Sequence, residues 1–281
     1  MLCMPEQPPM LIAVAPNGAR YSKADHSALP ISPKELAHTA RTCLEAGAGM
    51  IHLHVRDDQG KHTISSRYYI PAIAAIRKEV GSRMIIQATS ESAGIFNRHQ
   101  QMQAMTELMP ESVSIALREL IPDSATDSAA EAEACTFLSR LEDAGTLIQY
   151  IIYTPGELDR YQHLCDAGVI PGQRHMLLFV LGRYSETLAQ ASDLDTFVTA
   201  YKGKAAWMCC GFGKNEQSIM TRAAQLGGHA RVGFENNMQR ADGSMVADNS
   251  QLVTLTAEAA LGCGRPLATI AQGRTIFLHG K

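Results

Sequence analysis

The chain contains the run Ile51-His52-Leu53-His54-Val55-Arg56-Asp57, in which apolar and polar residues alternate. Residues two apart on a β-strand point to the same face, so His52 and His54 are expected to lie side by side. Far downstream, the run Arg231-Val232-Gly233-Phe234-Glu235-Asn236-Asn237 is typical of another short strand that ends in polar residues. Two imidazoles and one carboxylate, with a fourth position open, form the ligand set of a catalytic zinc site. The sequence therefore predicts a metal-dependent enzyme.

Short apolar runs, typical of buried strands, alternate with longer amphipathic stretches along the chain. The expected strands are residues 11–15, 49–55, 84–88, 112–116, 147–153, 175–181, 205–210 and 230–234. The expected helices are residues 33–46, 67–80, 98–109, 128–144, 155–167, 187–201, 215–226 and 250–261. This alternation in 281 residues is typical of a (β/α)8 TIM barrel, expected as a single domain over residues 1–281. A doubly wound open sheet competes, but the first turn, residues 15–20, lacks the G-x-G-x-x-G pattern.

The barrel topology brings the two distant runs together. Catalytic side chains of such barrels lie at the carboxyl ends of the strands. His52 and His54 end the second expected strand, and Glu235 ends the eighth. Both strands neighbour the first strand in a closed ring, so one ion near the end of the first strand can contact all three residues.

Composition and charge narrow the function classes. A chain that is 46% hydrophobic and 19% charged can bury a large core, and its net charge of −3 gives no electrostatic reason to expect nucleic acid or an anionic membrane. No apolar run approaches the roughly 20 residues that span a bilayer. The N-terminal residues, 1–5, do not suggest a secretory signal. Seven scattered cysteines without a C-x-x-C pair suit reduced thiols, so we expect a cytoplasmic protein.

The chain also resembles the β-keto acid cleavage enzymes, the group that contains 3-keto-5-aminohexanoate cleavage enzyme. Besides the two metal-ligand runs, the resemblance is carried by Ala15-Pro16-Asn17-Gly18-Ala19, Leu29-Pro30-Ile31-Ser32-Pro33-Lys34-Glu35, Glu45-Ala46-Gly47-Ala48, Phe179-Val180-Leu181-Gly182, Gly227-Gly228-His229 and Gly264-Arg265-Pro266-Leu267-Ala268-Thr269. Members are (β/α)8 barrels, usually tetrameric, that bind zinc, transfer CoA from acetyl-CoA to a fragment of a β-keto acid and release acetoacetate.

The resemblance implies specific partners and roles. Zn²⁺ is expected on His52, His54 and Glu235, with a β-keto acid and acetyl-CoA as substrates and a homo-oligomer, dimer or tetramer, as the assembly. The arginine that precedes the ligand glutamate in the family falls on Arg231, which there helps to position and activate the catalytic acid or base.

Departures from the family pattern change the expected chemistry. Asn236 stands where relatives carry the aspartate proposed as general base, and an amide accepts no proton at neutral pH. The third-strand Ser-Thr-Gly-Gly of relatives becomes Thr89-Ser90-Glu91-Ser92 here. Thr89 or Ser90 is expected to hydrogen-bond the developing oxyanion. Glu91 is a hypothetical replacement for the base.

Charged residues at the expected mouth suggest the substrate's charge. Arg20 aligns with the glutamate that reads an amino group in the aminohexanoate enzyme, and Arg118 aligns near a fourth-strand threonine. Either is an ordinary solvated arginine or a clamp for an anionic group. Together with Asn17, both are assigned to substrate binding, and the far end of the β-keto acid is expected to be anionic or neutral.

The segment Gly211-Phe212-Gly213-Lys214-Asn215 ends the seventh expected strand and begins a helix. Late loops of barrels often bind phosphate through backbone N–H groups at a helix start. We therefore assign Gly213 and Lys214 to a CoA phosphate, with the loop of residues 181–185 as a weaker candidate. A tight turn explains either segment without a ligand.

Two other functions remain open on sequence grounds. A metal-dependent aldolase, lyase or hydrolase that needs no CoA would use the same ion and open position. A non-catalytic descendant that binds a keto acid or metal would explain the missing aspartate.

Overall fold

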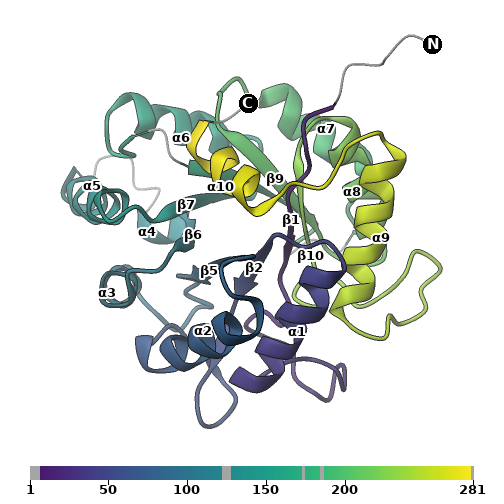
Figure 1. Ribbon diagram of the computed structural model, residues 1–281. Coiled ribbons are helices and arrows are strands. Elements are labelled where there is room, and N and C mark those ends of the chain that lie inside the picture. Colours follow the sequence, from purple (N-terminus) through teal and green to yellow (C-terminus); the bar gives the residue numbers. More distant parts are fainter. Residues whose placement is uncertain (1–6, 122–127, 173–174, 184–186, 280–281) are drawn as a thin grey trace.

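Eight parallel strands close into a barrel (Figure 1). The structure is a computed structural model that describes residues 7–121, 128–172, 175–183 and 187–279. Around the ring the order is β1-β10-β9-β8-β7-β6-β5-β2. The strands are β1 (Ile12–Val14), β2 (Met50–Leu53), β5 (Ile85–Thr89), β6 (Ser112–Ala116), β7 (Leu147–Ile152), β8 (His175–Leu181), β9 (Ala206–Gly211) and β10 (His229–Val232). The (β/α)8 TIM barrel predicted from the sequence is confirmed.

One helix follows nearly every strand and covers the outside of the barrel (Figure 1). The eight expected helices are α1 (Pro33–Glu45), α2 (Ser66–Val80), α3 (Arg98–Leu108), α5 (Ser128–Asp143), α6 (Glu157–Asp166), α7 (Ala191–Ala200), α8 (Glu216–Gln225) and α9 (Asn249–Gly262). Local chemistry explains the start of α1. Ser32 and Glu35 form a reciprocal capping box around Pro33 at the first helical position, where a missing N–H removes no hydrogen bond.

Four elements were not expected. The short helix α4 (Leu117–Leu120) directly follows β6, and α10 (Ile270–His279) ends the described chain. The strand expected over residues 49–55 is divided, because β2 pairs with β5 only as far as Leu53. Beyond His54 the chain forms a separate hairpin of β3 (Val55–Arg56) and β4 (His62–Thr63).

The core has an inner and an outer layer. Inside the barrel, side chains such as Leu11, Met50, Ile85 and Phe277 form a buried cluster. Phe277 belongs to α10, which packs against β5, β7, β8 and β9. A larger apolar cluster lies between the strands and the surrounding helices. The described helices include none that is long and apolar enough to cross a membrane.

The register of β1 fixes the geometry of the predicted site. Val14 pairs with Ile51 of β2 on one side and with Val232 of β10 on the other. The carboxyl ends of β2 and β10 therefore flank the end of β1, as the ring topology predicts, and the residues that follow them meet at one end of the barrel.

Candidate metal centre and active site

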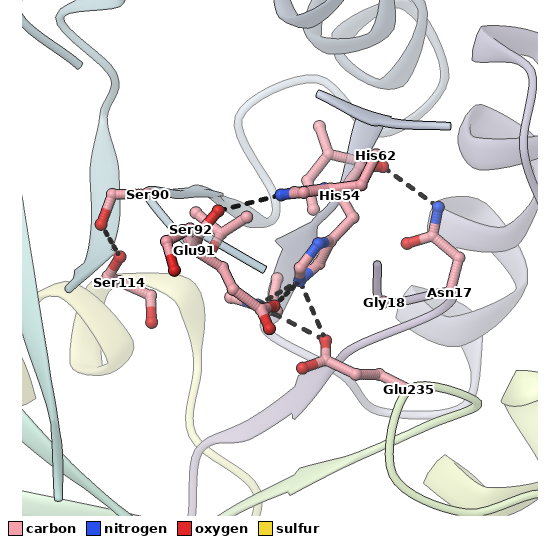
Figure 2. Close-up of polar contacts among 12 residues, drawn as sticks. Asn17, Gly18, His54, His62, Ser90, Glu91, Ser92, Ser114 and Glu235 are labelled. Carbon is pink, nitrogen blue, oxygen red and sulfur yellow. Dashed lines mark hydrogen bonds and ion pairs between the residues drawn. The ribbon is translucent and has the colours of Figure 1, made fainter. Parts of the chain in front are cut away.

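Three side chains meet at the carboxyl end of the barrel. The Nε2 atoms of His52 and His54 lie 3.1 Å apart, and the Oε2 atom of Glu235 lies 3.5 Å from the first and 3.3 Å from the second. Figure 2 shows the His54 ring and the Glu235 carboxylate directed toward each other. A tetrahedral zinc ion with bonds of about 2.0–2.1 Å separates its ligand atoms by about 3.3 Å. The triangle therefore matches one face of a zinc coordination tetrahedron.

The polar atoms of this triangle are prepared for a cation. Glu235 Oε2 is buried and has no hydrogen-bond partner among the described residues, which a bound ion would supply. His52 Nδ1 lies 2.8 Å from Gln87 Oε1, which can only accept a hydrogen bond. Nδ1 therefore carries the proton, and the lone pair of Nε2 is directed at the site. These residues fit a divalent metal ion.

Electrostatics favour the forms of these groups that bind metal. Burial, with Arg231 nearby, lowers the pKa of His52 to about 3, so the ring is neutral at physiological pH. Burial alone would raise the pKa of Glu235, but Arg231, His54 and His52 together lower it well below its ordinary value. The site thus presents the neutral imidazole of His52 and the ionised carboxylate of Glu235.

Two glycines allow Glu235 to approach the histidines. A Cβ atom on Gly18, whose φ is +59°, would lie 2.6 Å from Glu235 Cγ. A Cβ atom on Gly233, whose φ is +134°, would lie 2.4 Å from the carbonyl oxygen of Ala15. Both positions combine a positive φ with a close approach, and only glycine satisfies both conditions.

Arg231 orients the ligand carboxylate. Its Nη2 donates to Glu235 Oε1 at 3.0 Å, which leaves Oε2 to face the histidines. Burial would lower the pKa of Arg231, but Glu235 and Cys210 raise it above its usual value. The arginine is therefore a fixed positive charge beside the metal site, in the position that the resemblance assigned to it.

A small chamber opens beside the triangle. Its wall combines metal-site residues with charged and hydroxyl side chains: His52, Thr89, Glu91, Glu119, Tyr153, Arg183, Arg231 and Glu235. One oxygen of Glu91 pairs with Arg183, and the other lies 3.7 Å from His54 Nε2. The structure thus brings Thr89 and Glu91 to the metal site, as the sequence suggested.

Three other sequence candidates lie at the edge of this chamber or outside it. The Ser90 hydroxyl donates to the carbonyl oxygen of Ser114, and Asn17 Nδ2 donates to the carbonyl oxygen of His54, contacts that Figure 2 shows. Asn17 therefore holds the backbone of a ligand histidine. The buried side-chain amide of Asn236 has no hydrogen-bond partner among the described residues, and Asn236 lines a neighbouring groove.

The two arginines assigned to the substrate occupy different places. Arg20 lines a cavity of about 130 Å³, which we call the mouth. The mouth shares the lining residues Glu91, Arg183 and Glu235 with the chamber. Arg118 is exposed, and its guanidinium lies 3.6 Å from the centre of the Tyr153 ring. Arg118 thus stands behind a wall residue of the chamber rather than on the wall.

A groove of about 450 Å³ adjoins the mouth, with which it shares the lining residues Tyr21 and Phe212. Its apolar wall includes three partly exposed side chains, those of Tyr21, Leu188 and Met245. Gly213 lines the groove, whereas Lys214 is exposed and is not part of its wall. Of the weaker candidate loop, residues 184 and 185 lie outside the described residues.

Sequence reasoning missed Gln87 and Glu119, and it placed Arg183 only in a candidate phosphate loop rather than at the metal site. Gln87 was a lone polar residue in an apolar strand, a pattern that often marks a buried polar contact. Glu119 and Arg183 follow β6 and β8 within three residues, so their places at carboxyl strand ends were visible signals.

The fold is a (β/α)8 barrel, and its His-His-Glu cluster, which could hold a metal ion, lies at the carboxyl ends of the strands, where barrel enzymes have their active sites. The chain belongs to the beta-keto acid cleavage enzyme family, whose model matches residues 9–278. The resemblance found in the sequence is thereby confirmed.

Characterised relatives cover nearly the whole chain. It is 29% identical over 278 residues to the 3-keto-5-aminohexanoate cleavage enzyme of Fusobacterium nucleatum, covering 95% of this chain and 97% of the relative. It is 26% identical over 288 residues to the 3-oxoadipate:acetyl-CoA acetyltransferase of Cupriavidus necator, covering 96% of this chain and 94% of the relative. The solved complex of ObcA with oxaloacetate has a similar fold, with a TM-score of 0.69 and 16% identity over 90% of this chain and 68% of ObcA.

Proposed function

We propose that this protein is a zinc-dependent transferase that exchanges acyl groups between a β-keto acid and acetyl-CoA. A β-keto acid R–CO–CH2–COO⁻ and acetyl-CoA would give acetoacetate and R–CO–S–CoA. The observation that carries the proposal is the His52, His54 and Glu235 triangle in a chain of this family. The relatives named for acetyl-CoA-dependent activity support the choice of co-substrate.

The ion would polarise the keto and carboxylate oxygens of the substrate and stabilise the negative charge that develops there. Arg231 holds Glu235 in the orientation that the ion requires. Thr89 on the chamber wall is placed to stabilise charge on the substrate through its hydroxyl. Arg231 itself lines the chamber and supplies a second fixed cation for the substrate carboxylate.

The outer groove suits the long arm of acetyl-CoA. Its apolar side chains would pack against the pantetheine chain, and its connection with the mouth would let the thioester reach the chamber. In this proposal Gly213 and Asn236 contact the arm from the groove wall, and Lys214 beside them offers an exposed cation to a phosphate outside it.

The mouth favours a substrate whose far end is anionic or neutral. Arg20 lines it, and a guanidinium attracts carboxylate and repels ammonium, whereas Arg183 in the same wall is paired with Glu91. Arg118 stacks on Tyr153 behind the wall and lies 3.7 Å from the Glu157 carboxylate, so it contributes less charge to the mouth than Arg20. Replacing Arg20 by Gln should lower kcat/KM for a β-keto acid with a terminal carboxylate more than for one with an alkyl tail.

The test combines metal analysis with a substrate screen. Zinc-loaded protein is mixed with β-keto acids that bear alkyl, carboxylate or amino tails, with and without acetyl-CoA, and acetoacetate is measured. Glu235→Ala should lose both zinc and turnover, whereas Glu258→Ala, which removes an exposed glutamate on α9, should keep both.

Other outcomes would contradict the proposal in distinct ways. Cleavage without acetyl-CoA would indicate a lyase, aldolase or hydrolase on the same barrel. Zinc and keto acid binding without turnover of any substrate would indicate a non-catalytic descendant. The proposed assembly, a homodimer or homotetramer, is tested separately by light scattering of the purified protein.

A further inference from the structure

Glu119 is a second carboxyl on the chamber wall beside Glu91. It lies in α4, immediately after β6, and lines the chamber together with His52, Arg231 and Glu235. The backbone N–H of Ser92 donates to its Oε2 at 2.9 Å, which fixes the side chain relative to the Glu91 loop. It is therefore held in place next to the proposed reacting centre.

The two carboxyls have different electrostatic partners. Glu91 forms an ion pair with Arg183, and the side chains of the pair are only 8% and 11% exposed. In the described ranges of the chain no ion pair reaches Glu119. A carboxyl group that lies near another carboxylate and has no cation of its own is hard to ionise. Glu91, paired with Arg183, therefore acts as a fixed negative charge, and Glu119 is the group that can carry a proton.

The charged groups that face Glu119 agree with this division. Burial, the largest effect, raises the pKa of Glu119; the backbone hydrogen bond from Ser92 lowers it, the Glu91 carboxylate raises it, and the Arg183 guanidinium lowers it. The net effect raises the pKa of Glu119 above its ordinary value of 4.5. A carboxyl with a raised pKa is better matched to proton transfer near neutral pH than an ordinary one.

We infer that Glu119 is the catalytic proton acceptor and donor at C2 of the β-keto acid, with the Glu91–Arg183 pair as its fixed electrostatic partner. The inference rests on the proposed function. It assigns to Glu119 the role for which the sequence suggested Glu91 and which Asn236 cannot fill.

The proton balance of the reaction needs one such group. Glu119 takes a proton from C2, and the C2 carbanion forms a bond to the thioester carbon while the C–S bond breaks and CoA thiolate leaves. The thiolate then adds to the C3 keto carbon, and the C2–C3 bond breaks. The proton held by Glu119 returns to C2 of the departing acetoacetate, so no net proton is gained or lost.

Exchange of the C2 protons of acetoacetate with deuterium isolates this step, because it requires no CoA. Zinc-loaded wild-type protein, Glu119→Gln and Glu91→Gln are each mixed with acetoacetate in D2O, and the loss of the C2 signal is followed by NMR against the protein-free rate. Gln at position 119 still accepts the Ser92 hydrogen bond. Zinc content and acetoacetate binding, measured by titration, verify that each site is intact.

Glu119→Gln should lose about 10²- to 10⁴-fold in exchange rate and in kcat, the usual contribution of a general base. In wild type the exchange rate should fall as the pH is lowered through a pKa above 4.5. Glu91→Gln should keep this acid limb but move it to lower pH, because the Glu91 carboxylate that raises the pKa of Glu119 is gone, and Glu119→Gln should lack the limb. Glu119→Asp should recover part of the rate.

Four results would overturn the inference. Undiminished exchange in Glu119→Gln excludes the role, and loss of the acid limb in Glu91→Gln alone transfers it to Glu91. If wild type turns over a β-keto acid with acetyl-CoA and Glu119→Gln does so equally well, only the inference fails. If zinc-loaded wild type turns over no β-keto acid and exchanges no acetoacetate proton, the proposed function fails together with the inference.

Discussion

Replacing Gly18 by Ala tests whether close backbone approach creates the metal site. The new Cβ would lie 2.6 Å from Glu235 Cγ. Because carbon atoms pack at about 3.5–4.0 Å, Glu235 must retreat by about 1 Å. Such a shift moves its carboxylate out of bonding distance from an ion held by His52 and His54. We expect zinc affinity to fall by about 100-fold, the upper end of the effects seen when groups that orient metal ligands are replaced.

Gly60→Ala is the matched control. Gly60 also has a positive φ, +76°, but an added Cβ there meets no atom within 4 Å. Both variants carry the left-handed backbone cost of roughly 1–2 kcal/mol, partly offset by about 0.4–1 kcal/mol from a less flexible unfolded chain. Only Gly18→Ala adds the clash with Glu235.

Two measurements separate these effects. Competition with a chromophoric chelator gives the zinc affinity, and urea unfolding of the metal-free proteins gives the backbone cost. Gly60→Ala should bind zinc like wild type, and Gly18→Ala should be weaker in zinc binding and less stable than Gly60→Ala. Equal zinc affinity in the two variants would refute the reasoning.

Two further substitutions test the orientation of His52 by Gln87 and the effect of the buried His229 on the pH dependence of stability. Gln87→Leu removes the acceptor that fixes the proton of His52 on Nδ1, so zinc affinity measured by chelator competition should fall about 10- to 100-fold; unchanged affinity would show that Gln87 does not orient the ligand. His229 is buried and accepts a hydrogen bond from the N–H of Leu11, and burial lowers its pKa from 6.5 to about 3. Below pH 6.5 the unfolded chain binds a proton that the folded protein refuses, so stability falls as the pH drops toward 3. His229→Gln should make this loss smaller by about 1.4 kcal/mol per pH unit in urea unfolding of the metal-free protein, and an unchanged slope would contradict it.

The barrel was predictable because its signals are repetitive and local. Most barrel strands are short, largely apolar runs, and their alternation with amphipathic helices leaves few arrangements. The missed helix α10 has a weak signal, since Phe277 is its one fully buried side chain among those described. The division of the second expected strand after Leu53 depends on pairing with β5, which the local sequence does not specify.

The metal site was predictable for a different reason. Alternation in a strand places His52 and His54 on one face, and closure of the ring brings Glu235 to them. The contacts of the remaining side chains depend on rotamers and neighbours that spacing does not determine. The Ser90 hydroxyl is bonded to a neighbouring strand, whereas Glu119 from a short helix reaches the chamber.

The most direct measurement of the central claim is X-ray diffraction from zinc-soaked crystals at wavelengths on either side of the zinc absorption edge. The account predicts one anomalous peak per chain at the barrel mouth, about 2.0–2.2 Å from His52 Nε2, His54 Nε2 and a carboxylate oxygen of Glu235. A zinc-loaded crystal with no peak at this position, or with its peak on other residues, would contradict it.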